Sequence, residues 1–382
     1  MIYLDNAATT KISDSALNTY NKVAEKYFGN SFSLHDPGSE ASAVLEASRK
    51  NIAEIIGGDP AGLFFTGSGS EATFLAITSL VFANDKKGKH LITTKIEHSS
   101  VTNTFLWLEN RGFEVTRLGT GSDGRTDPEK LINAIRPDTI LASIQHVNSE
   151  IGTIQDLAEI GKILKENDVL FHSDCVQSFG KIPVDTSFFD VDALTLSAHK
   201  INGPKGTGAA WIRPTVEWMP FLPNGTHEKG FRPGTVDVPS IAAFAAAASD
   251  AEKSREQQFD KYMQQRNHFT EMLLSQTDGL IEILNPGNYS IPNIIGIRTC
   301  QMEGQYAMLE CSQKNLAIST GSACQVNEQK PSSMMLNLGY SEELARQLIR
   351  ISLGKFTSEH ELTEAARILG SVIKKQSRLV KS

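Results

Sequence analysis

Up to residue 212 the hydrophobic positions fall into two alternating patterns. Short apolar runs alternate with longer segments in which apolar residues recur at helical spacing. The apolar runs predict strands at residues 90–94, 114–118, 140–146, 169–173, 193–197 and 208–212. The longer segments predict helices at residues 13–27, 39–56, 99–111, 128–135 and 157–166. This alternation predicts an α/β fold with a mostly parallel sheet that helices cover on both faces.

The pattern changes in the last third of the chain. A Pro/Gly-rich stretch at residues 211–234 predicts a long loop, and an alanine-rich helix at 239–276 then leads into a smaller α+β domain. In that domain we expect strands at residues 293–297 and 316–319, helices at 342–351 and 359–373, and a solvated basic end at 374–382. The predicted parts are an N-terminal segment that packs with the small domain (1–15), a large domain (16–250) and the small domain (251–382).

The composition narrows the classes of function. The chain has 382 residues, 40% of them hydrophobic, and a net charge of −7. A mildly acidic chain argues against a nucleic-acid binder, which needs a basic face. No apolar run approaches the ~20 residues of a membrane-spanning helix, and the first residues do not resemble a signal peptide. Four cysteines without metal-ligand spacing favour a reducing, cytoplasmic setting.

One predicted strand ends in a lysine. The apolar run at residues 193–197 continues into Ala198, His199 and Lys200 and then breaks into Gly and Pro. A lysine at the edge of a sheet, partly removed from water, loses basicity and becomes an amine nucleophile. We expect Lys200 to carry pyridoxal phosphate as a Schiff base. Taken alone, the stretch is explained equally well by Lys200 and Lys205 as ordinary surface charges.

A Gly/Ser turn at residues 67–70 lies between an apolar run and a helix that reaches about residue 83. Backbone N–H groups at the start of a helix, with a serine hydroxyl beside them, can bind a phosphate. The turn lacks the Gly-Lys-Ser/Thr ending of a Walker loop and the third glycine of a dinucleotide fingerprint. It therefore suits a phosphate monoester. The open alternative is a tight turn with a serine N-cap.

Polar residues follow the carboxyl ends of other predicted strands, where ligands bind in parallel sheets. Asp174 can pair with a protonated ring nitrogen, and Gln177 can donate to the ring hydroxyl. His98 can lie on the ring or move protons near neutral pH. For His98, Asn148 and Asp174, each taken singly, a capping or core role explains the residue as well.

One cysteine lies in a polar segment. Residues 319–331 contain little that could be buried, so we expect Cys324 to be an exposed thiol on a loop. Cys300 and Cys311 lie in segments that we expect to be packed, and Cys175 is small filler beside Asp174. An incidental surface cysteine remains the alternative for Cys324.

Together these stretches resemble the cysteine desulfurases of the NifS/IscS type, in the class V aminotransferase group of pyridoxal phosphate fold type I. The resemblance runs nearly end to end. The Ser-Ala-His-Lys element ending at Lys200 and the Gly-Ser-Ala-Cys element ending at Cys324 are its most specific parts. The other matching stretches are residues 3–10, the turn before Glu71, 97–98, Asn148, 172–177, 232–235 and 349–354. The fold type implies a large domain with a sheet of seven strands and a smaller C-terminal domain.

The resemblance implies a role for each site residue. Lys200 forms the Schiff base, Asp174 pairs with the ring nitrogen, Gln177 binds the ring hydroxyl, and His98 stacks on the ring and takes part in catalysis. The residues implied for the phosphate are Gly69, Ser70, Ser197 and His199, with Thr235 reaching it from the other subunit of a homodimer. Asn148, which also belongs to the cofactor site, and Arg350 bind the substrate carboxylate. Cys324 is the catalytic cysteine that carries the persulfide. The resemblance implies no metal site, except that it leaves open a role for Cys324 as a transient iron–sulfur ligand.

This sequence departs from the usual family pattern at a few positions. Ser70 replaces a threonine and keeps the hydroxyl, whereas Ala72 and Phe74 replace polar residues. Ser149 replaces a second asparagine, and Cys175 replaces a common alanine. None of these changes removes a group that the chemistry needs.

The implied activity is removal of sulfur from L-cysteine, which yields L-alanine and a persulfide. An acceptor protein would take the sulfur: an iron–sulfur scaffold, a thiolation enzyme or a dedicated client enzyme. Two related activities on the same fold stay open: selenocysteine lyase and class V aminotransferase. A non-catalytic scaffold is disfavoured by the intact Lys200, Asp174 and Arg350, and a nucleotide-binding protein by the absence of a di- or triphosphate loop.

Overall fold

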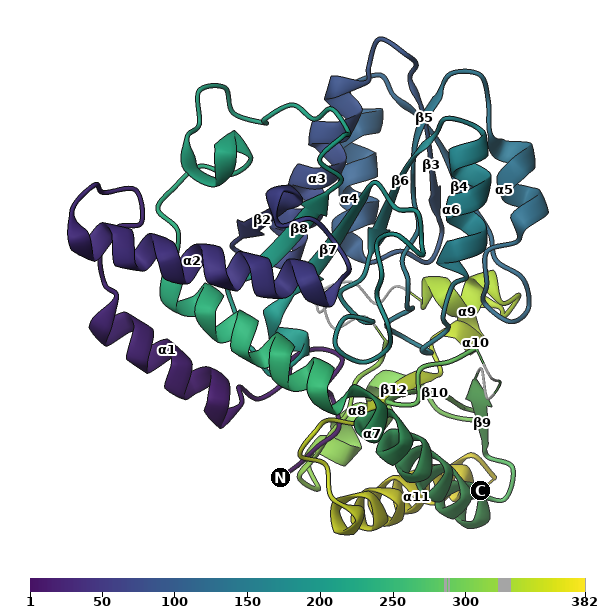
Figure 1. The fold of residues 1–382 in the computed structure, drawn as a ribbon. Coiled ribbons are helices and arrows are strands. Elements are labelled where there is room, and N and C mark those ends of the chain that lie inside the picture. Colours follow the sequence, from purple (N-terminus) through teal and green to yellow (C-terminus); the bar gives the residue numbers. More distant parts are fainter. Residues whose placement is uncertain (285–286, 288, 322–330, 382) are drawn as a thin grey trace.

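A central sheet of seven strands organises the larger part of the molecule (Figure 1). The computed structural model describes residues 1–284, 287, 289–321 and 331–381. In spatial order the strands are β2 (Leu63–Thr66), β8 (Gly208–Ile212), β7 (Ala193–Ser197), β6 (Leu170–Asp174), β5 (Thr139–Ser143), β3 (His90–Thr94) and β4 (Glu114–Leu118). Strand β8 pairs antiparallel with both β2 and β7, and the other neighbouring strands of this sheet pair in parallel. The predicted α/β fold with a mostly parallel sheet is confirmed.

Helices cover both faces of this sheet. On one face α3 (Gly69–Ala83) and α4 (Ser99–Glu109) pack in a hydrophobic cluster that contains Phe64 of β2. The other face meets α6 (Leu157–Glu166) and the first half of α7 (Val238–Thr277), in a cluster that contains Phe65. Because successive side chains of a strand point to opposite faces, a strand buried on both sides is apolar throughout, which is why these strands are continuous hydrophobic runs.

The remaining helices of the larger part lie around this core. Their bounds are α1 (Asp14–Lys26), α2 (Asp36–Ile55), α5 (Pro128–Ala134) and the short 3-10 helices Pro60–Gly62, Ala198–Lys200 and His227–Gly230. Helices α1 and α2 both pack against α7. Helix α2 begins three residues before the predicted start at residue 39, because the His35 ring caps the N–H of Gly38 and Pro37 occupies the first turn.

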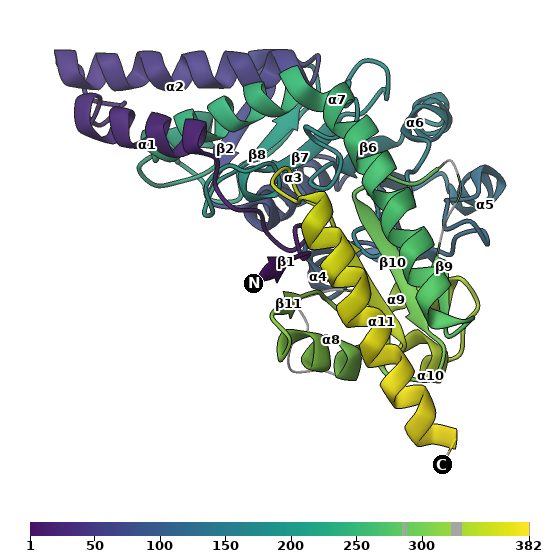
Figure 2. The same cartoon turned by 90° about the horizontal axis from the view of Figure 1, so that it is seen from below.

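Helix α7 contributes to two hydrophobic clusters. Its alanine-rich start packs on the central sheet, whereas Phe269 and Leu273 join a second cluster with α11 (Glu359–Lys381). Figure 2 shows this second half of α7 beside α11. The predicted boundary between residues 250 and 251 falls inside α7, and the division into domains stays a prediction.

A three-stranded antiparallel sheet underlies the second cluster, in the order β12 (Leu348–Ser352), β10 (Ile294–Thr299) and β9 (Ile281–Leu284). The N-terminal strand β1 (Ile2–Tyr3) pairs in parallel with β11 (Leu316–Ala317). The other helices of this part are α8 (Gly304–Ser312), α9 (Ser333–Asn337) and α10 (Glu342–Ala345).

The helix predicted at residues 342–351 is wrong over its second half. Helix α10 ends at Ala345, and the following residues form β12. Ile349 and Ile351 pack in the cluster with α11, whereas Leu348 packs in a different one, which is the alternation of a strand. Helix α11 extends beyond its predicted end at residue 373 to Lys381, and Lys374 and Lys375 in the predicted solvated end are exposed. The sequence analysis also missed β9 and α8.

Candidate active site

A pocket opens at the carboxyl ends of the parallel strands. It measures about 710 Å³, including space open to solvent. Eight of the residues predicted for the site line it, and they come from the ends of four different elements. They are Gly69, Ser70, His98, Asp174, Gln177, Ser197, His199 and Lys200. The tertiary fold therefore brings the phosphate turn, the lysine and the buried aspartate into one pocket.

Lys200 lies directly after β7, at the end of a short 3-10 helix. Its Nζ atom donates hydrogen bonds to the carbonyl oxygens of Ala7 and Ala8, both at 2.7 Å. This N-terminal segment is itself held in place, because the Thr10 hydroxyl donates to the carbonyl of His199 at 2.8 Å. The two alanine carbonyls orient the amine at the pocket wall, a contribution that the sequence analysis did not predict.

Asp174 ends β6 and is 7% exposed. Its Oδ1 atom accepts a hydrogen bond from the N–H of Val176 at 2.9 Å. Burial raises the pKa of Asp174 above its ordinary value, and His98, the Val176 N–H and Lys200 oppose this effect. A cation placed against this carboxylate would favour its ionised form. Asp174 is therefore suited to hold a positively charged ring nitrogen.

The turn before α3 approaches the sheet closely. The Ser68 hydroxyl caps the helix by accepting from the N–H of Glu71 at 3.0 Å. A Cβ atom on Gly69 would lie 3.0 Å from Cβ of Ser197, and one on Gly208 would lie 2.4 Å from the Ser68 carbonyl carbon. Glycine at these two positions lets the helix start sit over β7 and β8. The first N–H groups of a helix have no intrahelical partner, so an anion can bind there.

Two histidines flank the lysine and the turn. Nδ1 of His98 accepts from the N–H of Ser100 at 3.1 Å, so the neutral ring carries its proton on Nε2. Nδ1 of His199 lies 3.1 Å from the Thr9 hydroxyl. Burial and the nearby Lys200 lower the pKa of His199 to about 4. His199 is therefore a neutral imidazole at neutral pH, able to donate one hydrogen bond.

Glu97 is a buried carboxyl beside the pocket to which the sequence analysis gave no role. Its Oε1 atom accepts from the Thr94 hydroxyl at 2.6 Å and from the N–H of Gln145 at 3.0 Å. Burial raises the pKa of Glu97 to about 8, with a further contribution from Asp174. Gln145 lines the pocket, so Glu97 supports its wall. In the sequence, the signal that could have pointed to Glu97 is its position next to His98.

Three predicted residues do not line the pocket. Asn148 is 2% exposed, and its Oδ1 atom accepts from the N–H groups of Glu150 and Ile151. Thr235 is exposed. Arg350, in β12, donates from Nη1 to the carbonyl of Ser149 at 2.9 Å. Since Ser149 lines the pocket, Arg350 contacts a residue of the pocket wall without lining the pocket itself.

The cysteines differ in accessibility. Cys175 and Cys311 are fully buried, and burial raises the pKa of each thiol to about 12. Cys300 is partly exposed in the turn after β10. Cys324 lies outside the described residues. Over the described ranges no group of three or more His, Cys, Asp or Glu side chains is placed to hold a metal ion.

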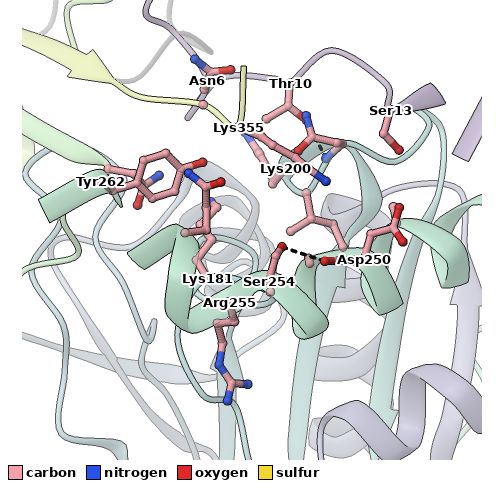
Figure 3. A pocket seen from close by; sticks show the side chains of 18 of the residues that line it. Asn6, Thr10, Ser13, Lys181, Lys200, Asp250, Ser254, Arg255, Tyr262 and Lys355 are labelled. Atoms are coloured by element: carbon pink, nitrogen blue, oxygen red, sulfur yellow. Dashed lines mark hydrogen bonds between the residues drawn. The ribbon is translucent and has the colours of Figure 1, made fainter. Parts of the chain in front are cut away.

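Lys200 also lines a second cavity, on the side of α7 (Figure 3). The labelled charged side chains around it include Lys181, Asp250, Arg255 and Lys355. Within the described part of the chain, no helix combines the length and apolar character needed to cross a membrane.

The residues of the first pocket fit pyridoxal phosphate. An amine at Lys200 can bond its aldehyde, a helix start with serine hydroxyls can bind its phosphate, and the buried Asp174 can hold its ring nitrogen. The fit depends on the approach of Gly69 to Ser197, which brings the helix start to within reach of the lysine strand.

Comparison with known proteins agrees with this geometry. The family model "Aminotransferase class-V" matches residues 2–364. A NifS protein of Bacillus subtilis (strain 168) is 44% identical over 365 residues, which are 95% of this chain and 92% of the relative. "Cysteine desulfurase IscS" of Anaeromyxobacter dehalogenans (strain 2CP-C) is 37% identical over 377 residues, 98% of this chain and 93% of the relative. A solved "NIFS-LIKE PROTEIN" superimposes with a TM-score of 0.91 at 30% identity, covering 98% of this chain and 99% of the other.

Proposed function

The chain belongs to the class V aminotransferase family, and we propose that it is a cysteine desulfurase that works with pyridoxal phosphate and carries sulfur on Cys324. The observation that supports this most is the common pocket of Lys200, Asp174 and the start of α3. These are an amine, a buried carboxylate and an anion site, at the ends of three different elements. The names of the relatives supply the substrate class, since they are desulfurases of cysteine.

When bound, pyridoxal phosphate supplies a ring that stabilises negative charge at the α-carbon of an amino acid. Lys200 would hold the cofactor covalently and, once released, take the α-proton on Nζ. The ionised Asp174 would keep a proton on the ring nitrogen. Gln177 would bind the ring hydroxyl, and His98 would lie over the ring and exchange a proton near the substrate sulfur.

Different groups of the protein would bind the cofactor phosphate and the substrate carboxylate. Gly69, Ser70, Ser197 and His199 would donate to the phosphate, and Thr235, which is exposed, would reach it from the partner subunit of a homodimer. Arg350 would bind the carboxylate with its planar guanidinium, next to Asn148.

Cys324 would attack the substrate sulfur as a thiolate. The C–S bond of L-cysteine breaks and an S–S bond forms on Cys324. Two protons are involved, one from the Cys324 thiol and one from the substrate sulfhydryl. One of them ends on L-alanine and the other on the persulfide. The sum is L-cysteine plus Cys324–SH giving L-alanine plus Cys324–S–SH. Among the other thiols, Cys175 and Cys311 are unsuited because burial holds each pKa near 12.

The persulfide would pass to an acceptor protein, such as an iron–sulfur scaffold or a dedicated client enzyme, in the cytoplasm. The cytoplasmic setting is supported by the low cysteine content, in which no disulfide framework is expected.

The test compares two single-cysteine changes in the purified protein. With L-cysteine and dithiothreitol, Cys324→Ala should abolish sulfide release while the absorbance near ~420 nm expected of the Schiff base remains. Cys300→Ala is the matched control and should keep full activity, because Cys300 does not line the pocket. Full desulfurase activity in Cys324→Ala would contradict the assignment, and alanine formation without a Cys324 persulfide would favour a selenocysteine lyase or an aminotransferase.

A further inference from the structure

We propose that Lys181 is a positioning residue that fixes the orientation of the Gln177 side-chain amide toward the cofactor ring. This inference rests on the proposed function, since it concerns the hydrogen bond between Gln177 and the ring hydroxyl. Lys181 lines the second cavity and is not among the residues that line the first, so we infer that it acts through Gln177.

The contacts of Lys181 converge on one residue. Its Nζ atom donates to the backbone carbonyl and to the side-chain Oε1 of Gln177, both at 3.1 Å. Below the pKa of Lys181 its ammonium has three donors and no acceptor, so the amide atom that faces it is the oxygen, as the structure has it. The nitrogen of the Gln177 amide therefore faces the other way. Lys181 thus decides which end of the amide the pocket receives.

The other end of the amide leads to the cofactor lysine. Nε2 of Gln177 donates to the carbonyl of Ala7 at 3.0 Å, and Lys200 donates to the same carbonyl at 2.7 Å. An amide nitrogen carries two hydrogens. One is used on Ala7, and the second is available to an oxygen on the ring. If the amide were turned, its oxygen would face both the Ala7 carbonyl and the ring hydroxyl oxygen.

A charged lysine at this buried position has a cost in folding free energy. Burial, together with the positive charges of Lys200 and Arg350, lowers the pKa of Lys181 to about 7. Within the described part of the chain, its hydrogen bonds go to the neutral Gln177 and to no carboxylate. A methionine would fill the same space without this electrostatic cost. Figure 3 shows Lys181 and Lys200 on the wall of one cavity.

A double-mutant cycle on cofactor affinity separates this role from a purely structural one. The apoproteins of the native chain, Lys181→Met, Gln177→Ala and the double variant are titrated with pyridoxal phosphate, and the dissociation constant is read from the Schiff-base absorbance. Each single change should weaken binding about tenfold, the effect of one hydrogen bond. The double variant should bind as Gln177→Ala does, within about twofold, because Lys181 has nothing left to orient.

Matched variants complete the design. Lys181→Arg keeps donors beside the Gln177 oxygen and should restore part of the affinity, whereas Lys162→Met, at an exposed lysine of α6, should change nothing. The melting temperature of each apoprotein shows that it is folded. An unchanged dissociation constant in Lys181→Met, or effects that multiply in the double variant, would overturn the inference alone. Failure of the native protein to bind pyridoxal phosphate would overturn the proposed function.

Discussion

Nη2 of Arg350 lies 2.7 Å from Oδ1 of Asp5, although 345 residues separate them in the chain. The Arg350 side chain is 3% exposed, so this ion pair is nearly closed to water. The contact joins β12 to the N-terminal segment whose alanine carbonyls hold Lys200. It therefore links the proposed carboxylate site to the cofactor lysine.

Arg350→Lys should raise the KM for L-cysteine at least about tenfold. A lysine keeps the charge but cannot contact Asp5, the Ser149 carbonyl and a carboxylate at once, because it lacks the planar set of five donors. Steady-state kinetics of alanine formation measure the effect, and the Schiff-base absorbance should be retained. Arg367→Lys, at an exposed arginine of α11, is the control. A KM that stays the same in Arg350→Lys would remove Arg350 from the substrate site.

Asp174→Asn should lower kcat at least about 100-fold while Lys200 still forms the Schiff base. Asparagine keeps the shape of the side chain and loses the charge that would hold a proton on the ring nitrogen, an electrostatic contribution of this usual size. Borohydride reduction followed by mass spectrometry of the Lys200 peptide shows that the linkage is intact. Near-native kcat in Asp174→Asn would mean that another group pairs with the ring.

Glu97→Gln should reduce the loss of folding stability that the native protein undergoes as the pH rises from 5 to 8. The folded protein keeps the Glu97 proton up to about pH 8, whereas the unfolded chain releases it near 4.5. The folded state thus binds the Glu97 proton more tightly between these values, and this group by itself removes about 1.4 kcal/mol of stability per pH unit as the pH rises. Glutamine has no such proton to lose.

Melting temperatures between pH 5 and pH 8 check this. The difference between Glu97→Gln and the native protein should grow steadily toward pH 8. Glu25→Gln, at an exposed position of α1, should show a constant difference. Parallel pH curves for Glu97→Gln and the native protein would show that Glu97 is already ionised in the folded state.

Glu228→Gln should reduce the free energy of unfolding by about 3 kcal/mol. Glu228 and Arg49 form a buried two-pronged ion pair at 2.8 Å, and Glu228 also accepts from the N–H of Phe65. Removal of the Glu228 charge leaves the buried Arg49 paired with the exposed Glu46 and deprives it of its buried counter-charge, which is strongly destabilising. Urea unfolding measures the loss. Glu364→Gln breaks an exposed pair on α11 and should have little effect, so equal losses in both variants would argue against the buried pair.

Much of the pocket was predictable because its residues follow strands. The apolar runs before Asp174 and Lys200 are local signals, and parallel strands bring their carboxyl ends to one edge of the sheet. The Gly/Ser turn before α3 is local in the same way. The roles of Arg350 and Asn148 stay predictions, since neither lines the pocket.

Other parts depend on contacts that no local pattern encodes. The helix predicted at residues 342–351 included most of β12 (Leu348–Ser352), and it is the pairing with β10 that makes these residues a strand. Glu97 appears as an ordinary acidic residue until the fold buries it against Gln145. The long-range pairing of Asp5 with Arg350 has no counterpart in periodicity or spacing.

The amino-acid sequence by itself determined the βα alternation, the lysine at a strand end and the anion-binding turn, because hydrophobic period and turn residues act over a few positions. Tertiary structure alone decided that Ala7 and Ala8 hold Lys200, that Arg350 contacts Asp5, and that Gln177 donates to the carbonyl of Ala7. These contacts arise from the docking of the N-terminal segment against β12 and β7. Burial there sets the charges of the site, and burial is a property of the folded chain as a whole.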